Sequence, residues 1–254
     1  MTPQWLKSRN VIERVYIAGM LTLTTPAHFG NGDTDSLTDI PLLRDSVDPT
    51  RPLLTGASIA GALRNYLREW QLGYGRAEQQ NGQTWAEKLF GHLDEPNEAT
   101  VESWLMVDDA LGLPPEKGAS IEIRDGVTID PKTRTAEDGK KYDIELLAAG
   151  TRFPLHFELW LTEEQKNEGL LDALVLALQG FEAAEPGSSG EIRLGMRKRR
   201  GFGRCRVAGW QIKRFEMTSP AKIVDWLNYD FPSEQELSAY TDTLPESTTL
   251  ITDE

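Results

Sequence analysis

The chain is poor in the residues that build disulfide frameworks and zinc centres. Its 254 residues include one cysteine, Cys205, and three histidines that lie far apart in the sequence. A lone cysteine excludes an internal disulfide, and three scattered histidines argue against a zinc site. We therefore expect a reduced, cytoplasmic setting, with Cys205 in the core at the start of a strand.

The chain also lacks a long hydrophobic run. Its longest apolar stretch, Ala173 to Leu178, is far shorter than the roughly 20 residues that a membrane-spanning helix needs. No signal-peptide pattern is visible, so we expect no membrane partner. A chain of 254 residues can bury a sizeable core, either as one elaborated domain or as two small ones.

Positive charge is in short supply, and the formal net charge is −13. Such acidity argues at first against a nucleic-acid partner. The imbalance is concentrated at the end of the chain, where nine acidic side chains and one lysine, Lys222, follow Phe215. Residues 1–215 therefore carry 31 acidic and 26 basic side chains, a net charge of −5. A local basic segment within that range can still bind RNA.

Hydrophobic periodicity predicts an α+β fold. The predicted elements are, in order, a strand at Val11–Thr24, a helix from Ser58, strands at Glu102–Asp108 and Ala119–Arg124, a hairpin at Gly126–Leu147, a strand at Arg152–Leu161, a helix after Thr162 and a strand at Arg204–Phe215. With the hairpin taken as an insertion, this order predicts a ferredoxin-like (RRM-like) β-α-β-β-α-β core. We expect one domain over residues 1–215, with the hairpin inserted at 126–147, and a short helix with an acidic tail over 216–254.

Short motifs predict where helices begin and end. Ser58 is predicted as the N-cap of the first long helix, whose apolar face includes Trp70. The run Thr162-Glu163-Glu164-Gln165 has the pattern of a capping box. A short helix is predicted at Trp85–Phe90, ended by Gly91. Another is predicted to begin with Ser219 as its N-cap and Pro220 at its first position, and to run through Leu227.

An acidic loop precedes the first long helix. It carries Asp33, Asp35, Asp39, Asp45 and Asp48. The helix start offers backbone N–H groups and the positive end of a dipole, which suits phosphate. An aspartate beside it can hold a divalent metal or orient an attacking 2′-hydroxyl, and Asp39 is the sharpest candidate. The alternative is that the loop is ordinary solvated surface.

Two further residues near this loop have both a functional and a structural interpretation. His28 can act as a general base, although a lone histidine is more often structural. Arg64, on the helix, can contact RNA or be a solvated helix arginine.

A basic, glycine-bearing segment lies near the end of the predicted domain, from Gly195 to Arg204. Glycines at 195, 201 and 203 allow close backbone approach to phosphate, and the cations around them supply charge. Phe202 can stack on a base or pack under the loop. The hairpin tip adds Lys132 and Arg134, although taken alone this tip is a solvated hairpin.

Six segments carry a family resemblance when they are taken in order. They are His28-Phe29-Gly30, Asp39 to Asp45, Thr55 to Arg64, Leu89-Phe90-Gly91, Arg124 to Asp130, and Arg199 to Arg204. Together they resemble the RAMP superfamily of CRISPR proteins, specifically the backbone subunit of type III effector complexes. The resemblance spans about residues 11 to 215.

The resemblance implies an RNA-guided endoribonuclease subunit for antiviral defence. Its partners would be a CRISPR guide RNA, a complementary target RNA and other subunits of a ribonucleoprotein, including copies or paralogues of itself. Asp39 matches the family's catalytic aspartate, which supports cleavage with Mg²⁺ or Mn²⁺, and the hairpin matches the family's thumb. Together with the charge pattern, the resemblance assigns RNA contacts to His28, Ser58, Arg64, Lys132, Arg134, Arg197, Lys198, Arg199, Arg200, Gly201, Phe202, Gly203 and Arg204.

Three alternatives remain open at this point. The chain can be a catalytically silent backbone subunit that binds RNA without cutting it. It can be a guide-processing endoribonuclease of the same superfamily, acting without metal through a residue such as His28. Outside the family, it can be a generic single-strand RNA-binding domain.

Overall fold

The computed structural model describes residues 10–30, 32, 38–75, 84–94, 99–185 and 187–229. The mixed α+β prediction is confirmed, with antiparallel sheets and helices. Asp33, Asp35 and the acidic tail from residue 230 lie outside the described residues. Among the helices that the structure describes, none is long and apolar enough to cross a membrane.

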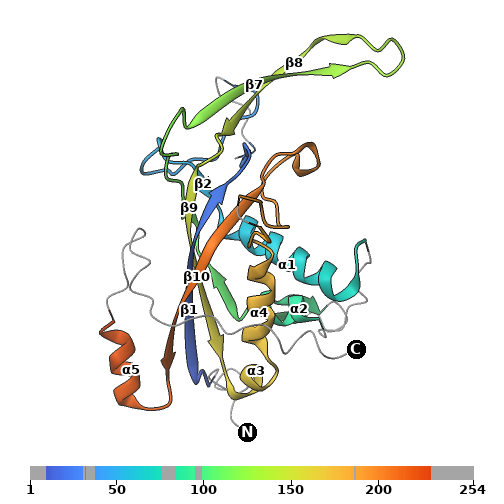
Figure 1. The fold of residues 1–254 in the computed structure, drawn as a ribbon. Helices are drawn as coiled ribbons and strands as arrows, with labels where there is room; N and C mark the ends of the chain where they lie inside the picture. The colour runs from blue at the N-terminus through green and yellow to red at the C-terminus, as the bar shows by residue number, and fades with distance from the viewer. Residues whose placement is uncertain are drawn as a thin grey trace.

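A four-stranded antiparallel sheet forms the centre of the molecule (Figure 1). Its order is β10 (Cys205–Glu216), β1 (Glu13–Leu23), β9 (Arg152–Leu161) and β5 (Leu105–Val107). The two-residue alternation of β1 and β9 sends one set of side chains to a buried face. Ile17 on that face pairs with Phe157 on one side and Ile212 on the other, which fixes the register.

Helices cover the buried face of the sheet (Figure 1). They are α1 (Gly56–Leu72), α2 (Trp85–Phe90), α3 (Glu163–Asn167) and α4 (Leu170–Gln179). Ile59, Leu63 and Leu67 lie on one face of α1, and their side chains are fully buried. Each such side chain contributes about 1.5–3 kcal/mol by leaving water. Helices and sheet therefore share one hydrophobic core.

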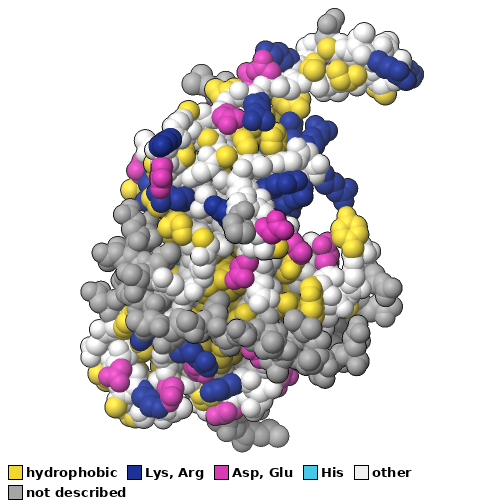
Figure 2. Space-filling view, viewed as in Figure 1, with side chains coloured by type: hydrophobic (Ala, Val, Ile, Leu, Met, Phe, Trp, Pro, Cys, Tyr) yellow, Lys and Arg dark blue, Asp and Glu magenta, His cyan; other side chains and the backbone are white. Residues whose placement is uncertain are grey.

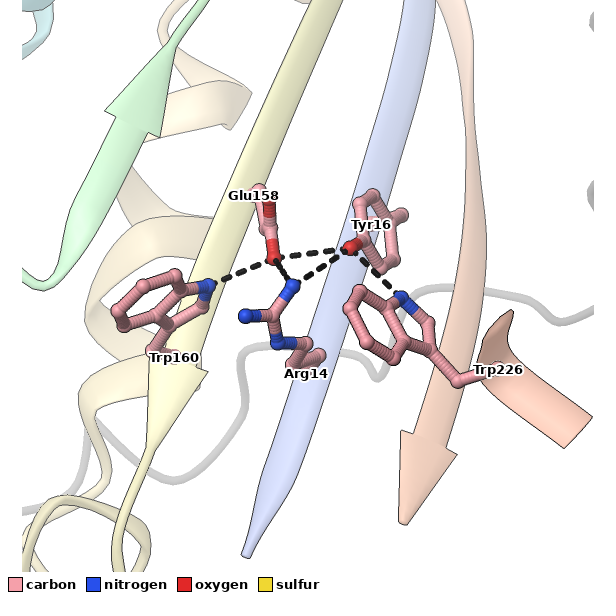
Figure 3. Close-up of polar contacts among 5 residues, drawn as sticks. All are labelled: Arg14, Tyr16, Glu158, Trp160 and Trp226. Carbon is pink, nitrogen blue, oxygen red and sulfur yellow. Dashed lines mark hydrogen bonds and ion pairs between the residues drawn. The ribbon is translucent and has the colours of Figure 1, made fainter. Parts of the chain in front are cut away.

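Helix α5 (Pro220–Leu227) lies on the opposite side of the sheet (Figure 1). The Arg14 guanidinium stacks between Trp160 and Trp226, 4.6 and 4.1 Å from the ring centroids (Figure 3). It also forms an ion pair with Glu158 at 3.0 Å, while the Trp226 indole donates to the Tyr16 hydroxyl. This cluster fastens α5 to β1 and β9.

A long hairpin projects from the body of the molecule (Figure 1). It consists of β7 (Ile121–Ile129) and β8 (Ala136–Leu147), so it begins five residues before the predicted Gly126. The predicted turn is present, because the Asp130 carboxylate accepts hydrogen bonds from the backbone N–H groups of Lys132 and Thr133. Two small strand pairs complete the fold: β2 (Leu53–Leu54) with β6 (Ala110–Leu111), and β3 (His92–Asp94) with β4 (Ala99–Val101).

Two helix-start predictions are wrong. The N-cap of α1 is Thr55 instead of Ser58, and the Thr55 side chain accepts a hydrogen bond from the Ser58 N–H. The first helical residue, Gly56, lies so close to β5 that a Cβ atom there would be 2.1 Å from the Val107 carbonyl oxygen. The Thr162 side chain makes no bond to a helix N–H, since its hydroxyl contacts the Gln165 side chain instead.

The sequence also predicted elements that are longer than those observed. The helix after Thr162 is interrupted at Gly169, which has a φ of 72° and separates α3 from α4. The predicted strand at Glu102–Asp108 shrinks to β5, because the Ser103 hydroxyl bonds to the Leu89 and Leu105 carbonyls and turns the chain there. Trp70, expected on the core face of α1, is 45% exposed.

Candidate nucleic-acid interface

A groove of about 810 Å³ lies between helix α1 and the segment that carries the basic loop. On the α1 side its wall includes Ser58, Gly61 and Asn65, and on the other side it includes Arg193 and Lys198. The α1 side of the groove also includes the small residues Ala57 and Ala62. Ser58, a predicted RNA contact, therefore lines the same groove as Lys198 and Arg199 of the basic loop.

The basic loop is shaped by glycines in close backbone contact. Gly203 has a φ of 71°, and a Cβ atom there would lie 1.8 Å from the Leu194 carbonyl oxygen. Gly195 has a φ of 81° and lies against the backbone of His28. Between these glycines, Lys198–Arg200 forms a short 3₁₀ turn. Glycine is required here because both the positive φ and the close approach exclude a side chain.

The cations at this loop contact neutral polar groups of the protein. The Arg199 guanidinium donates to the Tyr74 hydroxyl at 3.0 Å across the groove, and Arg193 donates to the Lys198 carbonyl at 3.0 Å. Within the part of the chain that the structure describes, no carboxylate forms an ion pair with Lys198, Arg199 or Arg200. Their charge therefore stays available to phosphate.

Basic side chains gather below the hairpin (Figure 2). The loop contacts the hairpin directly, since the Arg197 guanidinium lies 4.9 Å from the Tyr142 ring centroid. In a second contact the cation comes from the hairpin and the ring from the loop: Arg124 of β7 lies 5.4 Å from the centroid of the Phe202 ring. Phe202 therefore packs under a hairpin cation in this structure. These cation–π contacts hold the loop against the base of the hairpin.

The groove also contains negative charge. The Tyr66 hydroxyl lies at the groove beside Glu191. Burial, followed by the charge of Glu191 and a hydrogen bond to it, raises the pKa of Tyr66 to about 12. Tyr66 thus remains a neutral hydrogen-bond donor over the whole physiological range.

His28 is a structural link in this arrangement. Its side chain is only 1% exposed, which corrects the picture of an open loop histidine. The ring Nδ1 atom donates to the Glu145 carbonyl at 2.7 Å, and the His28 carbonyl accepts from the Met196 N–H at 3.0 Å. His28 therefore connects the hairpin to the basic loop, with its ring at the wall of the groove.

Asp39 is exposed and lies at the base of the hairpin. Its Oδ2 atom accepts a hydrogen bond from the Asp143 backbone N–H at 2.9 Å. Asp125, opposite Asp143 in the hairpin, has its pKa lowered by a hydrogen bond and ion pair with Lys141. The surroundings of Asp39 are thus a charged, solvent-facing edge of the hairpin.

The described surroundings of Asp39 bear on whether it could hold a metal ion. Among the described residues, no three His, Cys, Asp or Glu side chains form a group that could hold a metal ion. Magnesium is commonly bound by one or two carboxylates together with waters and substrate phosphates. An exposed Asp39 carboxylate fits that mode of binding, with RNA phosphates supplying further ligands.

The other predicted RNA contacts lie at separate places. Lys132 and Arg134 are exposed at the hairpin tip, while Arg200 and Arg204 are exposed on the loop. Arg64 lines a second hollow of about 400 Å³ with Phe90 and Leu105, so it does not join the groove beside the basic loop.

Sequence reasoning missed several residues that organise the interface. Tyr74, Arg124, Tyr142, Glu145 and Arg193 contribute through contacts with distant segments. Arg193 had a detectable signal, since it lies two residues before Gly195 in the basic segment. The role of Glu145 had none, because its partners are more than a hundred residues away.

Comparison with known proteins adds a family to this geometry. None of the curated proteins matches the chain. The profile of the RAMP superfamily matches residues 20–206, a range that includes the groove, the hairpin and the basic loop. The match supports a CRISPR-associated, RNA-binding role in a complex with RNA and other subunits, and some RAMP proteins are endoribonucleases. The chain belongs to the RAMP superfamily.

Proposed function

We propose that the chain is the guide-RNA-binding backbone subunit of a type III CRISPR ribonucleoprotein and cleaves complementary target RNA through Asp39. The observation that supports the proposal most directly is that the basic loop, the hairpin and the Asp39 loop are bonded to one another. His28 joins the basic loop to the hairpin, and the Asp39 loop is bonded to that same hairpin. A binding groove, a projecting hairpin and a candidate catalytic carboxylate thus meet within one connected structure.

The fold supports this assignment. The sheet order β10-β1-β9-β5, with α1 and α4 on one face, is what a ferredoxin-like core would have, and we propose that topology for the chain. We further propose that residues 1–215 form the RAMP domain, with the hairpin as its thumb. Helix α5 and the tail would then be an addition to that domain.

The groove favours a backbone-directed mode of RNA binding. Unpaired cations on the loop can neutralise phosphates regardless of base sequence. Tyr66 and Asn65 offer neutral hydrogen-bonding groups along the same wall. A subunit with these features can hold any guide sequence, as an RNA-guided complex requires.

Asp39 is placed to act on a strand that passes the hairpin base. Its carboxylate is exposed, and one oxygen is held by the Asp143 N–H, so its direction is restricted. We propose that this oriented carboxylate positions the reacting groups of the target RNA, with Mg²⁺ or Mn²⁺ supplying Lewis-acid stabilisation of the phosphate when bound.

Changing Asp39 to alanine tests the catalytic part of the proposal. Because the carboxylate acts as charge develops on the phosphate, Asp39→Ala should reduce target cleavage by about 10²-fold or more. Guide and target binding should stay within about twofold. The measurement follows labelled target RNA with the assembled complex in magnesium or manganese.

Asp48→Ala is the matched control, since the Asp48 carboxylate is also exposed and accepts hydrogen bonds from Thr50 in its own turn. Its cleavage rate should equal that of the wild type. Normal cleavage by Asp39→Ala would contradict the catalytic assignment. Absence of cleavage by the wild-type complex would favour a silent backbone subunit, whereas cleavage by the isolated chain in chelator would favour guide processing. The burial of His28 disfavours the latter.

A further inference from the structure

The segment that carries Asp39 is bonded to the hairpin edge as an additional short strand. Ile40 forms a parallel bridge with Ile144. The Ile40 N–H donates to the Asp143 carbonyl at 3.1 Å, and the Glu145 N–H donates to the Ile40 carbonyl at 3.2 Å. These two bonds and the Asp39–Asp143 bond use the edge of β8 that points away from β7. The hairpin therefore contributes directly to the position of Asp39.

Beyond Asp39, the Glu145 side chain adds to the backbone bonds that hold this strand, among them the Leu43 N–H bond to the Phe29 carbonyl at 2.7 Å. The Glu145 Oε2 atom accepts from the Leu42 backbone N–H at 3.0 Å and from the Arg44 guanidinium at 3.2 Å. The Glu145 backbone carbonyl accepts from His28 at the same time. Glu145 thus contacts the Asp39 segment, the groove wall and the hairpin together.

The surroundings of the Glu145 side chain strengthen these hydrogen bonds. Its side chain is 16% exposed and that of Arg44 is 29% exposed, so the pair is partly shielded from water. Charge-assisted bonds of this kind are stronger than neutral ones, and a buried N–H left without its acceptor is costly. Removal of the carboxylate would therefore leave the Leu42 N–H without its acceptor and loosen the strand between Ile40 and Arg44, which its backbone bonds still hold in part.

We propose that Glu145 is a positioning residue for the cleavage reaction, holding Asp39 in its productive place through the Leu42 and Arg44 contacts. This inference rests on the proposed function of Asp39. Glu145 itself touches neither RNA nor the reacting atoms. A displacement of about 1 Å at a reacting group can reduce a rate by about 10²-fold, which is the scale of effect that a released strand would produce.

The test compares three substitutions in the assembled, guide-loaded complex. Glu145→Ala should lower the single-turnover cleavage rate at saturating target by about 10- to 100-fold, while target affinity stays within about twofold. Glu145→Gln should recover most of the rate, because the amide oxygen can still accept from Leu42. The control is Glu122→Ala, on the same hairpin, since the Glu122 carboxylate pairs with Arg124, two positions along β7, and the substitution should leave the rate unchanged.

Arg44→Ala keeps the test decisive if Glu145→Ala does not assemble. It removes the Arg44 contact to the Glu145 carboxylate and leaves the Leu42 N–H bond in place. Arg44→Ala should therefore lower the cleavage rate, but by less than Glu145→Ala does. A wild-type rate for Arg44→Ala in that case would overturn the proposal. A wild-type rate for Glu145→Ala, or equal loss in Glu145→Ala and Glu122→Ala, would also overturn it.

Hydrogen exchange on the isolated chain separates this inference from the proposed function. Glu145→Ala should speed exchange of backbone amides in residues 39–45 and leave those of β1 and β9 unchanged. Unchanged exchange in 39–45 would overturn the anchoring even if cleavage falls. If residues 39–45 exchange faster while both Glu145→Ala and Asp39→Ala cleave normally, Glu145 does hold the Asp39 segment, but that contact has no part in cleavage. The error would then lie in the proposed function of Asp39.

Discussion

Two glycines of the basic loop, Gly201 and Gly203, both have positive φ angles but different surroundings. A Cβ atom at Gly201 would meet nothing within 4 Å, whereas one at Gly203 would lie 1.8 Å from a backbone oxygen. Gly201→Ala should therefore cost only the backbone strain of about 1–2 kcal/mol. Gly203→Ala also forces the backbone apart and should cost more than about 3 kcal/mol.

Chemical denaturation of the two variants measures this difference, and RNA binding should follow it. We expect Gly203→Ala to lose RNA affinity as well as stability, because the loop can no longer close on Leu194. Equal destabilisation by both substitutions would show that the loop backbone is not packed as described.

Tyr66 gives a prediction for alkaline pH. Burial and Glu191 raise its pKa from 10.0 to about 12. Between pH 10 and 12 the unfolded chain loses the phenol proton while the folded chain retains it, so this group's contribution to stability is lost as pH rises. Tyr66→Phe should therefore lose less stability than wild type between pH 9 and 11, measured by urea denaturation. Parallel declines would mean that Tyr66 is not buried beside Glu191.

At the residue scale, local chemistry was predictable and long-range roles were not. The glycines and cations of the basic loop, and the buried position of Cys205, follow from composition and spacing. The link through His28 joins residues 117 positions apart, and the Leu42–Glu145 bond joins residues 103 apart. No local pattern encodes such contacts, because they depend on how the hairpin returns to the body.

The hairpin is the element whose function can be tested apart from the core. Residues 131–136 at its tip are exposed, and the base is where Arg124 and Tyr142 contact the basic loop. Replacing Pro131–Lys141 with a short turn should change the melting temperature little, since exposed tips carry little buried surface. If the hairpin is the thumb, trimming should blur the spacing of target cleavage, read on a sequencing gel.

A sharp, regular ladder from the trimmed variant would contradict the thumb assignment. An intact melting temperature is the control that the core has folded. A large fall in that temperature would instead make the hairpin part of the stabilising core.

Two identical-looking motifs show what sequence can predict about elements. The pattern Thr-x-x-Glu/Gln occurs at Thr84–Glu87 and at Thr162–Gln165. Only the first forms a reciprocal capping box, with Glu87 just 1% exposed. In the second, the two side chains contact each other instead of the helix backbone. Motif spacing thus identifies where a cap is possible, while packing decides whether it forms.

At the scale of the whole molecule, basic side chains are concentrated locally on an acidic chain (Figure 2). The chain is strongly acidic, yet basic side chains gather below the hairpin (Figure 2). The α+β class and the order of the main elements were predictable from periodicity. The docking of α5 on the second face of the sheet was not, because it depends on Arg14, Trp160 and Trp226 from three separate elements (Figure 3).

The most direct measurement of the central claim is the sequence of RNA that co-purifies with the chain from its native host. If the groove and basic loop hold a guide, the recovered RNA should be uniform in length and share a repeat-derived end. Replacement of Arg197, Lys198, Arg199 and Arg200 with alanine should lower the yield, because up to four phosphate contacts are lost. Absence of RNA, or a heterogeneous mixture unaffected by those substitutions, would contradict a guide-binding subunit.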